Sequence, residues 1–384
     1  MTDTLPGTTL GIVGGGQLGR MLGEAASPLG VETVVLDPTA DCPAFPPAVD
    51  QIEADFDDQA AVRDLADRVD VLTLEIELAD PDALASVQEA TGTPVHPAPE
   101  DLRVTRDKLR EKERLDEAGI PVPAYRGVES AADLESAFEE LGSPLMLKAR
   151  TGGYDGRGNA VVESVGEAES YFGSLSGLIA EALVDFEREL SVIGVRGADE
   201  TRTYPVGENV HEAEILRETL VPGRTTDNRR ARATEVAETV LSVFEGRGVF
   251  GIELFETRDG EILVNEIAPR PHNSGHYSIE GTVTSQFEQH VRAVLGLPLG
   301  STALLAPTAT ANILGDEGEP RPVSLEGTDS LLAMDGIHLH WYGKREVRPL
   351  RKLGHVTTTG PDLAVNHEQV IEARETLRFG GGED

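Results

Sequence analysis

Residues 145–159 read Leu-Met-Leu-Lys-Ala-Arg-Thr-Gly-Gly-Tyr-Asp-Gly-Arg-Gly-Asn, and this stretch decides the fold. Its apolar start predicts a strand that carries Lys148, and its four glycines predict a flap, Gly152–Gly158, that folds closely over a ligand. No Gly-Lys-Ser/Thr follows, so this is not a Walker phosphate loop. A strand lysine beside such a flap holds triphosphate oxygens, because the ammonium neutralises charge and the flap supplies backbone donors. The alternative is a glycine-rich hairpin, which would not need the interleaved aromatic and charged residues.

A second glycine loop lies near the N-terminus. Gly14-Gly15-Gly16-Gln17-Leu18-Gly19, the N-terminal glycine loop, follows an expected strand and opens an expected helix. Asp37 ends the next expected strand, 18 residues after Gly19 (37 − 19). In this arrangement the glycines let a phosphate approach backbone N–H groups at a helix N-terminus. The loop therefore predicts an anion site, and leaves open an NAD(P) cofactor, a phosphorylated substrate or a purely structural tight turn.

Two glutamates are expected to face each other across a hairpin. The apolar segments 249–255 and 261–267 flank Asp259-Gly260, a favoured two-residue type I′ turn, which places Glu253 opposite Glu266. Carboxylates in this position repel each other. A magnesium ion would reverse the sign, because it binds carboxylate and phosphate oxygens together. Asn265 points to the other face of an ideal strand, so it needs a twist or bulge to join the site. Two solvated glutamates are the alternative, which the apolar flanks disfavour.

The composition excludes several classes of protein. With 33 basic and 68 acidic residues among 384, the formal net charge is −35, which argues against a nucleic-acid partner. The acid is spread along the whole chain, and such self-repulsion is tolerated when salt screens it, so we expect a halophilic source. Cys42 is the single cysteine, which excludes an intrachain disulfide. No signal peptide or membrane-length apolar stretch is present, so we expect a cytoplasmic protein of two or three domains.

Lysine is scarce in this chain. It has only five, and arginine supplies nearly all the other positive charge. A chain that avoids lysine keeps it where a compact ammonium is needed. Lys148 lies beside the flap, and Lys344 and Lys352 form a basic cluster with Arg351, which suits a phosphate group or, alternatively, is a solvated surface.

The pattern along the chain indicates three domains. Residues 6–100 alternate strands and helices, which implies a parallel α/β sheet. The proline-rich segment 95–99 is expected to be a linker, and one helix is expected over 102–118. Further expected elements are helices over 131–141, 229–244 and 363–377 and strands over 178–182 and 190–195, with short strands around Trp341.

Four motifs in order resemble a known family. They are Gly14–Met21, Arg150–Gly158, Asn265–His276, and His340–Lys344 together with Arg351–His355. Together they resemble the ATP-grasp superfamily and, within it, the N5-carboxyaminoimidazole ribonucleotide synthetases, from Gly11 to about His355. The resemblance implies an α/β ATP-grasp fold. Its parts would be a Rossmann-like parallel-sheet domain (1–100), a central α+β ATP-grasp domain (101–304) and a small β-rich domain (305–384).

The resemblance also implies ligands and site residues. The ligands would be ATP, Mg²⁺, bicarbonate and aminoimidazole ribonucleotide, and the chain would form a homodimer. ATP would be held by Arg106, Lys148, Gly153, Tyr154, Asp155, Gly156, Arg157, Gly158, Glu181, Val184, Glu189, His211, Asn265 and Glu266. Magnesium would be held by Glu253 and Glu266. The ribonucleotide and the carboxyl intermediate would be bound by Gln17, Leu18, Glu75, Asp155, Arg157, Arg270, His272, Asn273, Lys344, Arg351 and Lys352.

The implied reaction is phosphoryl transfer followed by carboxylation. Bicarbonate attacks the γ-phosphate of ATP, and the amine of the ribonucleotide captures carboxyphosphate or the CO₂ released from it. Asp155, Arg270 and Lys344 are the expected catalytic residues, with Asp155 orienting or deprotonating the amine and Arg270 holding bicarbonate. Two departures stand out: Leu350 replaces the family's usual glycine, and Glu75-Ile76-Glu77-Leu78 leaves open which glutamate contacts substrate, although we favour Glu75.

Three other functions compete with this interpretation. The nearest is the formate-dependent glycinamide ribonucleotide transformylase, which shares the layout. A non-catalytic ATP-binding regulatory protein would bind ATP without turnover. An NAD-dependent dehydrogenase would leave the flap and the paired glutamates unexplained.

Overall fold

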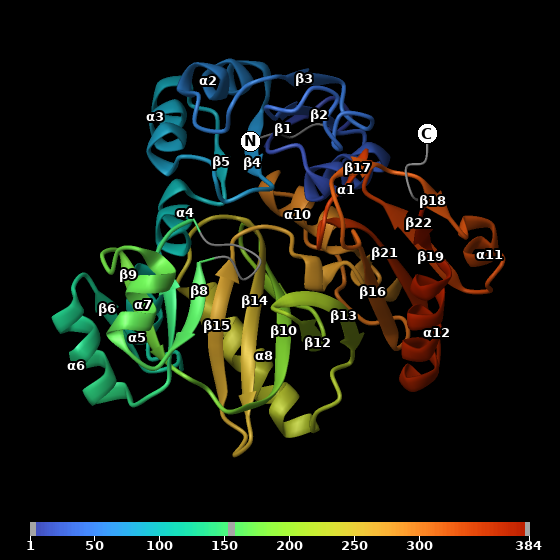
Figure 1. Cartoon of the computed structure of the whole chain (residues 1–384). Helices are drawn as coiled ribbons and strands as arrows, with labels where there is room; N and C mark the ends of the chain where they lie inside the picture. The colour runs from blue at the N-terminus through green and yellow to red at the C-terminus, as the bar shows by residue number, and fades with distance from the viewer. Residues whose placement is uncertain (1–4, 153–157, 381–384) are drawn as a thin grey trace.

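The computed structural model describes residues 5–152 and 158–380. The N-terminal part of the chain forms a parallel sheet (Figure 1). The strand order β3-β2-β1-β4-β5 reverses between β1 and β4, and in such sheets ligands bind beyond the carboxyl ends of the strands at the reversal. The expected α/β architecture is confirmed. The elements are β1 (Thr9–Val13), α1 (Gln17–Ala26), η1 (Ser27–Leu29), β2 (Glu32–Leu36), β3 (Asp50–Ile52), α2 (Gln59–Arg68), β4 (Val71–Leu74), α3 (Pro81–Thr91) and β5 (Val95–His96).

The segment expected to be a linker belongs to this sheet. Val95 and His96 form β5, which pairs in parallel with β4 at the sheet edge. Pro99 is the first residue of α4 (Pro99–Thr105). Prolines are tolerated beside edge strands and at the first position of a helix, so the same composition serves an edge strand and a linker.

The single helix expected over 102–118 is in fact two helices. α4 ends at Thr105, and α5 (Lys108–Glu117) begins after Asp107, whose carboxylate accepts hydrogen bonds from the N–H groups of Leu109 and Arg110. Aspartate is among the strongest N-cap residues, so it starts a new helix here. This break makes Lys108 the first residue of α5.

A small antiparallel sheet carries Lys148. Its strand order is β6-β9-β7-β8, and α6 and α7 contribute buried Leu134 and Ala168 to the core beneath it. The elements are β6 (Tyr125–Val128), α6 (Ala131–Leu141), β7 (Leu145–Ala149), β8 (Asn159–Val162), α7 (Val165–Phe172) and β9 (Leu178–Ala182). In Figure 1 this green unit stands beside the larger sheet.

The larger sheet joins the middle and the end of the chain. Its order is β15-β14-β10-β12-β13-β16-β21-β19, with β11 pairing β10. β13 pairs with β16, so the sheet continues past residue 304. Its elements are β10 (Phe186–Arg196), β11 (Thr201–Thr203), β12 (Gly207–Glu212), β13 (Ile215–Val221), α8 (Asp227–Ser242), β14 (Gly248–Thr257), β15 (Ile262–Ala268), β16 (Thr308–Leu314), β19 (Ile337–Trp341) and β21 (Lys352–Thr359).

Shorter elements complete the C-terminal part. They are η2 (Asn273–Gly275), α9 (Ser278–Gly281), α10 (Gln286–Val294), β17 (Arg321–Pro322), β18 (Leu325–Glu326), α11 (Thr328–Leu332), β20 (Glu346–Val347), α12 (Leu363–Thr376) and β22 (Arg378–Phe379). Over the ranges that the structure describes, no helix is long and apolar enough to cross a membrane.

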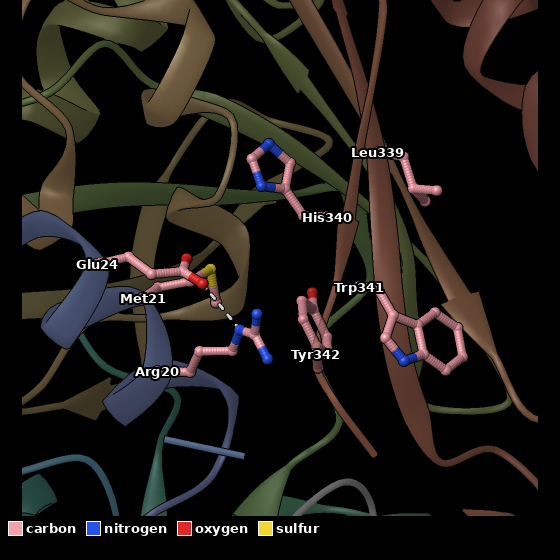
Figure 2. A pocket seen from close by; sticks show the side chains of 7 residues that line it. All are labelled: Arg20, Met21, Glu24, Leu339, His340, Trp341 and Tyr342. Atoms are coloured by element: carbon pink, nitrogen blue, oxygen red, sulfur yellow. Dashed lines mark hydrogen bonds and ion pairs between the residues drawn. The ribbon is translucent and has the colours of Figure 1, made fainter. Parts of the chain in front are cut away.

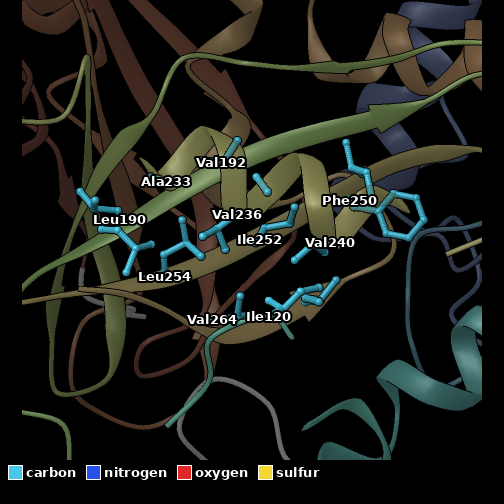
Figure 3. Packing of buried hydrophobic residues seen from close by; sticks show 14 of the residues in the cluster. Ile120, Leu190, Val192, Ala233, Val236, Val240, Phe250, Ile252, Leu254 and Val264 are labelled. Carbon is cyan, nitrogen blue, oxygen red and sulfur yellow. The ribbon is translucent and has the colours of Figure 1, made fainter. Parts of the chain in front are cut away.

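The core under β10, β14 and β15 makes this part of the sheet a rigid platform. Val236 and Val240 of α8 pack against Val192, Ile252 and Leu254 (Figure 3), all at most 2% exposed. Burying one such side chain contributes about 1.5–3 kcal/mol. The strands that carry the two glutamates are therefore firmly anchored on one face.

Candidate active site

The β14–β15 hairpin places Glu253 directly opposite Glu266, as predicted. The predicted turn, however, is wrong. The loop has three residues, Arg258–Gly260, with the N–H of Gly260 donating to Thr257 and a positive φ of 94° at Gly260. A glycine in this conformation is typical of three-residue loops that end in a bulge.

A β-bulge at Asn265 restores the predicted pairing. Near the turn Phe255 opposes Leu263 and Leu254 opposes Val264, so a regular ladder would put Glu253 opposite Asn265. The register shifts between Glu253 and Leu254, and Glu266 becomes the partner instead. This is the kind of irregularity that Asn265 was expected to need in order to join the site. Its Oδ1 accepts a hydrogen bond from Lys148 Nζ at 3.2 Å.

Three lysines converge on these strands. Lys148 on β7 lies 2.8 Å from Glu181 Oε2, and Lys112 on α5 lies 3.6 Å from the other carboxylate oxygen of Glu181. Lys108 Nζ donates to Glu266 Oε2 at 2.7 Å. Three of the five lysines in the chain therefore lie around Glu181, Asn265 and Glu266.

The two opposed glutamates, the carboxylate pair, are compensated unequally. Burial raises the pKa of Glu253 to about 7; nearby His211 opposes this rise, and the Glu266 charge adds to it. Burial also works against the charge of Glu266, but the Lys108 ammonium outweighs it and holds that pKa down at about 2. Glu266 thus has an ammonium group at hydrogen-bond distance, whereas Glu253 has no comparable cation among the described residues.

This arrangement fits a magnesium ion. A hard dication between the carboxylates would remove the repulsion that burial aggravates at Glu253. Within the described part of the chain, no three His, Cys, Asp or Glu side chains converge as a complete metal site. The remaining ligands would be phosphate oxygens and water, as is usual for magnesium at phosphate-transfer sites.

The residues predicted to hold the rest of ATP lie on β10, on β12 and in the connection that precedes β10. Glu189 on β10 lies 3.1 Å from His211 on β12. Burial disfavours the charged imidazole, but the hydrogen bond to Glu189 and the charges of Glu253 and Glu189 together outweigh it and raise the pKa of His211. Val184 is half-buried in the connection between β9 and β10, next to Glu181.

Arg106 lies apart from these contacts, and Lys108 was missed by the sequence analysis. The Arg106 guanidinium donates to the carbonyl of Ala79 at 2.8 Å. Lys108, two residues later, reaches Glu266 because Asp107 starts a new helix. The scarcity of lysine was the available signal, since Lys108 and Lys112 were the two lysines left without a role.

The flap lies mostly outside the described residues. Gly153, Tyr154, Asp155, Gly156 and Arg157 are among those not described. Gly158, at its end, has a φ of 79° and accepts a hydrogen bond from the Ala149 N–H at 2.8 Å. The predicted roles of the five residues remain predictions.

The N-terminal glycine loop holds carboxylates of its own chain. Glu75, after β4, accepts hydrogen bonds from the N–H groups of Gly16 at 2.8 Å and Gly19 at 3.1 Å. Asp37 accepts from Gly15 at 2.8 Å. Burial raises the pKa of Glu75 although these two backbone donors oppose the rise. The donors expected to meet a phosphate are thus already engaged.

Gln17, Leu18 and Glu77, which lie near this loop, have different surroundings. Gln17 is the first residue of α1, whereas the Leu18 side chain is 5% exposed and packs in the core. Glu77, not Glu75, pairs with Arg270, at 3.0 Å from its Nε.

The basic cluster lies on and around β21. Lys344 Nζ donates to the carbonyl of Lys352 at 2.8 Å, and Arg351 donates to the carbonyl of Glu346 at 3.0 Å. Lys352 is near enough to Glu253 to lower its pKa, so the cluster borders the carboxylate pair. Leu350 has a φ of 60°, the left-handed conformation that its replacement of a glycine put in question.

Two further predicted residues follow β15. His272 lies 3.8 Å from Glu253 and 2.9 Å from the hydroxyl of Ser274. Both polar atoms of the Asn273 amide are buried without a hydrogen-bond partner among the described residues. An unpaired buried amide is costly, and this one is available to a ligand.

A separate cavity of about 250 Å³ lies between α1 and β19 (Figure 2). It is lined by Arg20, Met21, Glu24, Leu339, His340, Trp341 and Tyr342. Arg20 is held by Glu24 at 2.8 Å, and the Tyr342 hydroxyl by His355 at 2.9 Å. Its lining shares no residue with the predicted sites, so we do not place a substrate there.

Comparisons with known proteins agree with this geometry. Three families match consecutive parts of the chain: the ribonucleotide synthetase preATP-grasp domain at 7–106, the ATP-grasp domain at 113–287 and the phosphoribosylaminoimidazole carboxylase C-terminal domain at 308–369. The N5-carboxyaminoimidazole ribonucleotide synthase of Bacillus subtilis is 41% identical and covers 92% of this chain and 91% of its own.

Solved structures are equally similar. The N5-carboxyaminoimidazole ribonucleotide synthetase of Thermotoga maritima superposes with a TM-score of 0.88 at 41% identity, covering 97% of this chain and 99% of its own. The Aspergillus clavatus enzyme in complex with ADP and 5-aminoimidazole ribonucleotide gives 0.87 at 35% identity, covering 96% and 98%.

Proposed function

This chain belongs to the N5-carboxyaminoimidazole ribonucleotide synthases, ligases of the ATP-grasp superfamily, and from this membership we propose how its residues carry out the reaction. The substrates are ATP, bicarbonate and 5-aminoimidazole ribonucleotide. The single observation that carries the proposal is the convergence of Lys148 and Lys108 on the strand that bears one member of the carboxylate pair.

The carboxylate pair and the lysines neutralise the phosphates of ATP. Lys148 and Lys108 lie within 3 Å of Glu181 and Glu266, so both ammonium groups lie beside the carboxylates that would face the phosphates. Glu253 and Glu266 would hold magnesium, which would supply positive charge to offset the charge that develops during transfer. Glu181, Val184, Glu189 and His211 would hold the rest of the nucleotide.

The basic cluster and the segment after β15 take the ribonucleotide. Lys344, Arg351 and Lys352 supply positive charge for its phosphate, in a chain whose net charge is −35. The unpaired amide of Asn273 offers a donor and an acceptor, and His272 lies between it and Glu253. Gln17 and Leu18 would contribute from the start of α1, Leu18 through its backbone because its side chain is in the core.

Bicarbonate is expected between these two ends. The Arg270 guanidinium, held by Glu77, follows β15 and has the fork geometry that matches carboxylates and phosphates. A bicarbonate oxygen attacks the γ-phosphate, the bond to ADP breaks, and carboxyphosphate forms. The exocyclic amine then bonds to the carboxyl carbon and phosphate leaves, while Asp155 on the flap orients the amine or takes its proton. Closure of the flap would protect carboxyphosphate from water.

The surroundings in which the protein works are also part of the proposal. The charge of −35, spread over the chain, supports function at high salt, where self-repulsion is screened. The single, buried Cys42 suits a reducing cytoplasm. The resemblance to the family supports a homodimer.

The test is phosphate release from ATP in concentrated KCl with magnesium. Release that requires bicarbonate and increases with 5-aminoimidazole ribonucleotide is the expected result. Release that ignores this ribonucleotide but responds to formate and glycinamide ribonucleotide would contradict the proposal.

A further inference from the structure

Lys112 is a buried lysine that none of the proposed steps uses. Its side chain is 1% exposed on the inner face of α5. The ammonium donates to the carbonyls of Val264 at 3.0 Å and Asn265 at 2.8 Å, and lies 3.6 Å from Glu181. The ammonium thus donates two hydrogen bonds to carbonyls, and the Glu181 carboxylate compensates its charge from beyond hydrogen-bond distance. Such a compensated buried charge is specific to its position, because an uncompensated one costs several kcal/mol.

The two carbonyls are consecutive, and this is unusual in a strand. Successive peptide groups of a regular strand point in opposite directions, so one ammonium cannot bond both carbonyls. The bulge at Asn265 removes this alternation locally. Lys112 therefore bonds a geometry that exists only when the bulge is present.

The bulge in turn decides which residue faces Glu253. Without it, the register set by Leu254 and Val264 would continue and Glu253 would oppose Asn265. Glu266 would then lie one residue away, on the opposite face. Beyond Glu266, the N–H of Ile267 donates to Glu111 at 3.3 Å, so α5 holds β15 on both sides of the metal-binding position.

Glu181 connects the same lysine to Lys148. One oxygen of Glu181 lies near Lys112 and the other near Lys148, and Lys148 also bonds the Asn265 amide. Lys112, Glu181, Lys148 and Asn265 thus form a closed ring of contacts, which Lys112 completes through the backbone carbonyl of Asn265.

We propose that Lys112 is a positioning residue that holds the β-bulge at Asn265 and thereby sets the spacing of the carboxylate pair. This inference rests on the proposed role of that pair in holding magnesium. Lys112 acts through its contacts with β15 and Glu181.

The test compares Lys112→Met with Arg110→Met. Both variants remove one positive charge from α5, but Arg110 is exposed and makes only a 3.8 Å contact with Asp107. ADP affinity is measured by calorimetry at increasing magnesium concentration. Removing such supporting contacts lowers metal affinity about 10–100-fold, so Lys112→Met should need at least tenfold more magnesium for the same ADP affinity. The rise in melting temperature caused by 5-aminoimidazole ribonucleotide should stay as in the wild type.

Each outcome decides the inference. A magnesium requirement of Lys112→Met within twofold of Arg110→Met would overturn it, and so would an equal loss of ribonucleotide binding. If Lys112→Met does not fold, Lys112→Gln replaces it under the same thresholds, because its amide can donate to one carbonyl but carries no charge. A wild-type protein that gains no ADP affinity from magnesium would overturn the proposed function as well, whereas wild-type magnesium dependence retained in the variant overturns only the role of Lys112.

Discussion

The carboxylate of Glu75 and the carboxylate pair are stabilised in opposite ways. Glu75 enters the N-terminal glycine loop, and backbone N–H groups of Gly16 and Gly19 satisfy both of its oxygens. Glu253 and Glu266 face each other across a hairpin, and only Glu266 has a lysine at hydrogen-bond distance. The first carboxylate completes the fold with fixed partners. The second pair keeps an uncompensated charge that a cation can relieve.

This difference separates a structural anion site from a catalytic one. A glycine-rich loop is a general device for holding an anion at a helix N-terminus, and that anion can come from the chain itself. Opposed carboxylates destabilise a hairpin unless something outside the strands binds between them. Loss of charge should therefore lower stability at Glu75 and lower activity at Glu266.

The largest effect is expected from Glu266→Gln. This variant removes a carboxylate from the pair and frees Lys108, so ATP turnover should fall by about 10²–10³-fold, while folding stability changes little. Phosphate release and urea unfolding measure the two effects. Glu261→Gln, an exposed position near the same turn, is the matched control. More than a tenth of wild-type turnover in Glu266→Gln would remove Glu266 from the site.

The next effect concerns Glu75→Gln. Its amide nitrogen would face a glycine N–H, and leaving a buried donor unpaired costs about 1–3 kcal/mol of unfolding free energy. Urea unfolding of this variant and of Glu53→Gln, an exposed control, measures the loss. Unchanged stability with lost ribonucleotide affinity would instead assign Glu75 to substrate binding.

A smaller effect with a defined pH dependence is expected at Asp107. Burial opposes its charge, but the hydrogen bonds and charge of Arg150, together with the backbone donors at the helix start, outweigh it and lower the pKa of Asp107 below 3.8. The ion pair therefore stabilises the fold above pH 3.8, and this contribution is lost as the pH falls through the lowered pKa. Asn is an equally good cap, so Asp107→Asn isolates the charge.

This variant should lose about 1 kcal/mol at pH 7 and the same amount at pH 5. The difference from the wild type should shrink only below pH 4, as urea unfolding in a pH series would show. A difference that already vanishes at pH 5 would contradict the lowered pKa.

The smallest effect lies outside both carboxylate sites. Leu350 has a φ of 60° and is 43% exposed. The left-handed conformation costs a non-glycine residue about 1–2 kcal/mol, and glycine loses roughly 0.5–1 kcal/mol in entropy, so Leu350→Gly should stabilise the chain by about 0.5 kcal/mol. Leu350→Ala keeps a Cβ atom and should give no gain. Equal stability of the two variants in urea would show that this backbone is not strained.

Local patterns predicted the strands that carry Lys148, Glu253 and Glu266, and the opposition of the two glutamates, but not the contacts that set this pair. The apolar segments around Glu253 and Glu266 indicated a hairpin, and their opposition was found correctly although the turn was misjudged by one residue. The bulge at Asn265 adds one residue to β15. This offsets the extra residue in the turn and leaves Glu253 opposite Glu266. A bulge held by Lys112 depends on where α5 packs, which no local pattern contains.

The same limit applies to the glycine loop and the lysines. Glu75 lies 59 residues from Gly16, so its occupation of the loop follows from the order of β1 and β4 in the sheet. Lys108 reaches Glu266 because Asp107 starts a new helix within a segment whose pattern predicts one continuous helix. The scarcity of lysine was more informative about the site than the local patterns. Lys108 and Lys148 contact glutamates of the proposed ATP site, Lys112 contacts β15, and Lys344 and Lys352 lie in the basic cluster.

The most direct test of the account follows oxygen from bicarbonate to phosphate. The wild-type protein is given ATP, magnesium, 5-aminoimidazole ribonucleotide and ¹⁸O-labelled bicarbonate in concentrated KCl, and the released phosphate is analysed by mass spectrometry. Attack of bicarbonate on the γ-phosphate predicts phosphate that carries one ¹⁸O atom. Unlabelled phosphate, formed at the same rate, would show that water attacks instead and would contradict the proposal that this site forms carboxyphosphate.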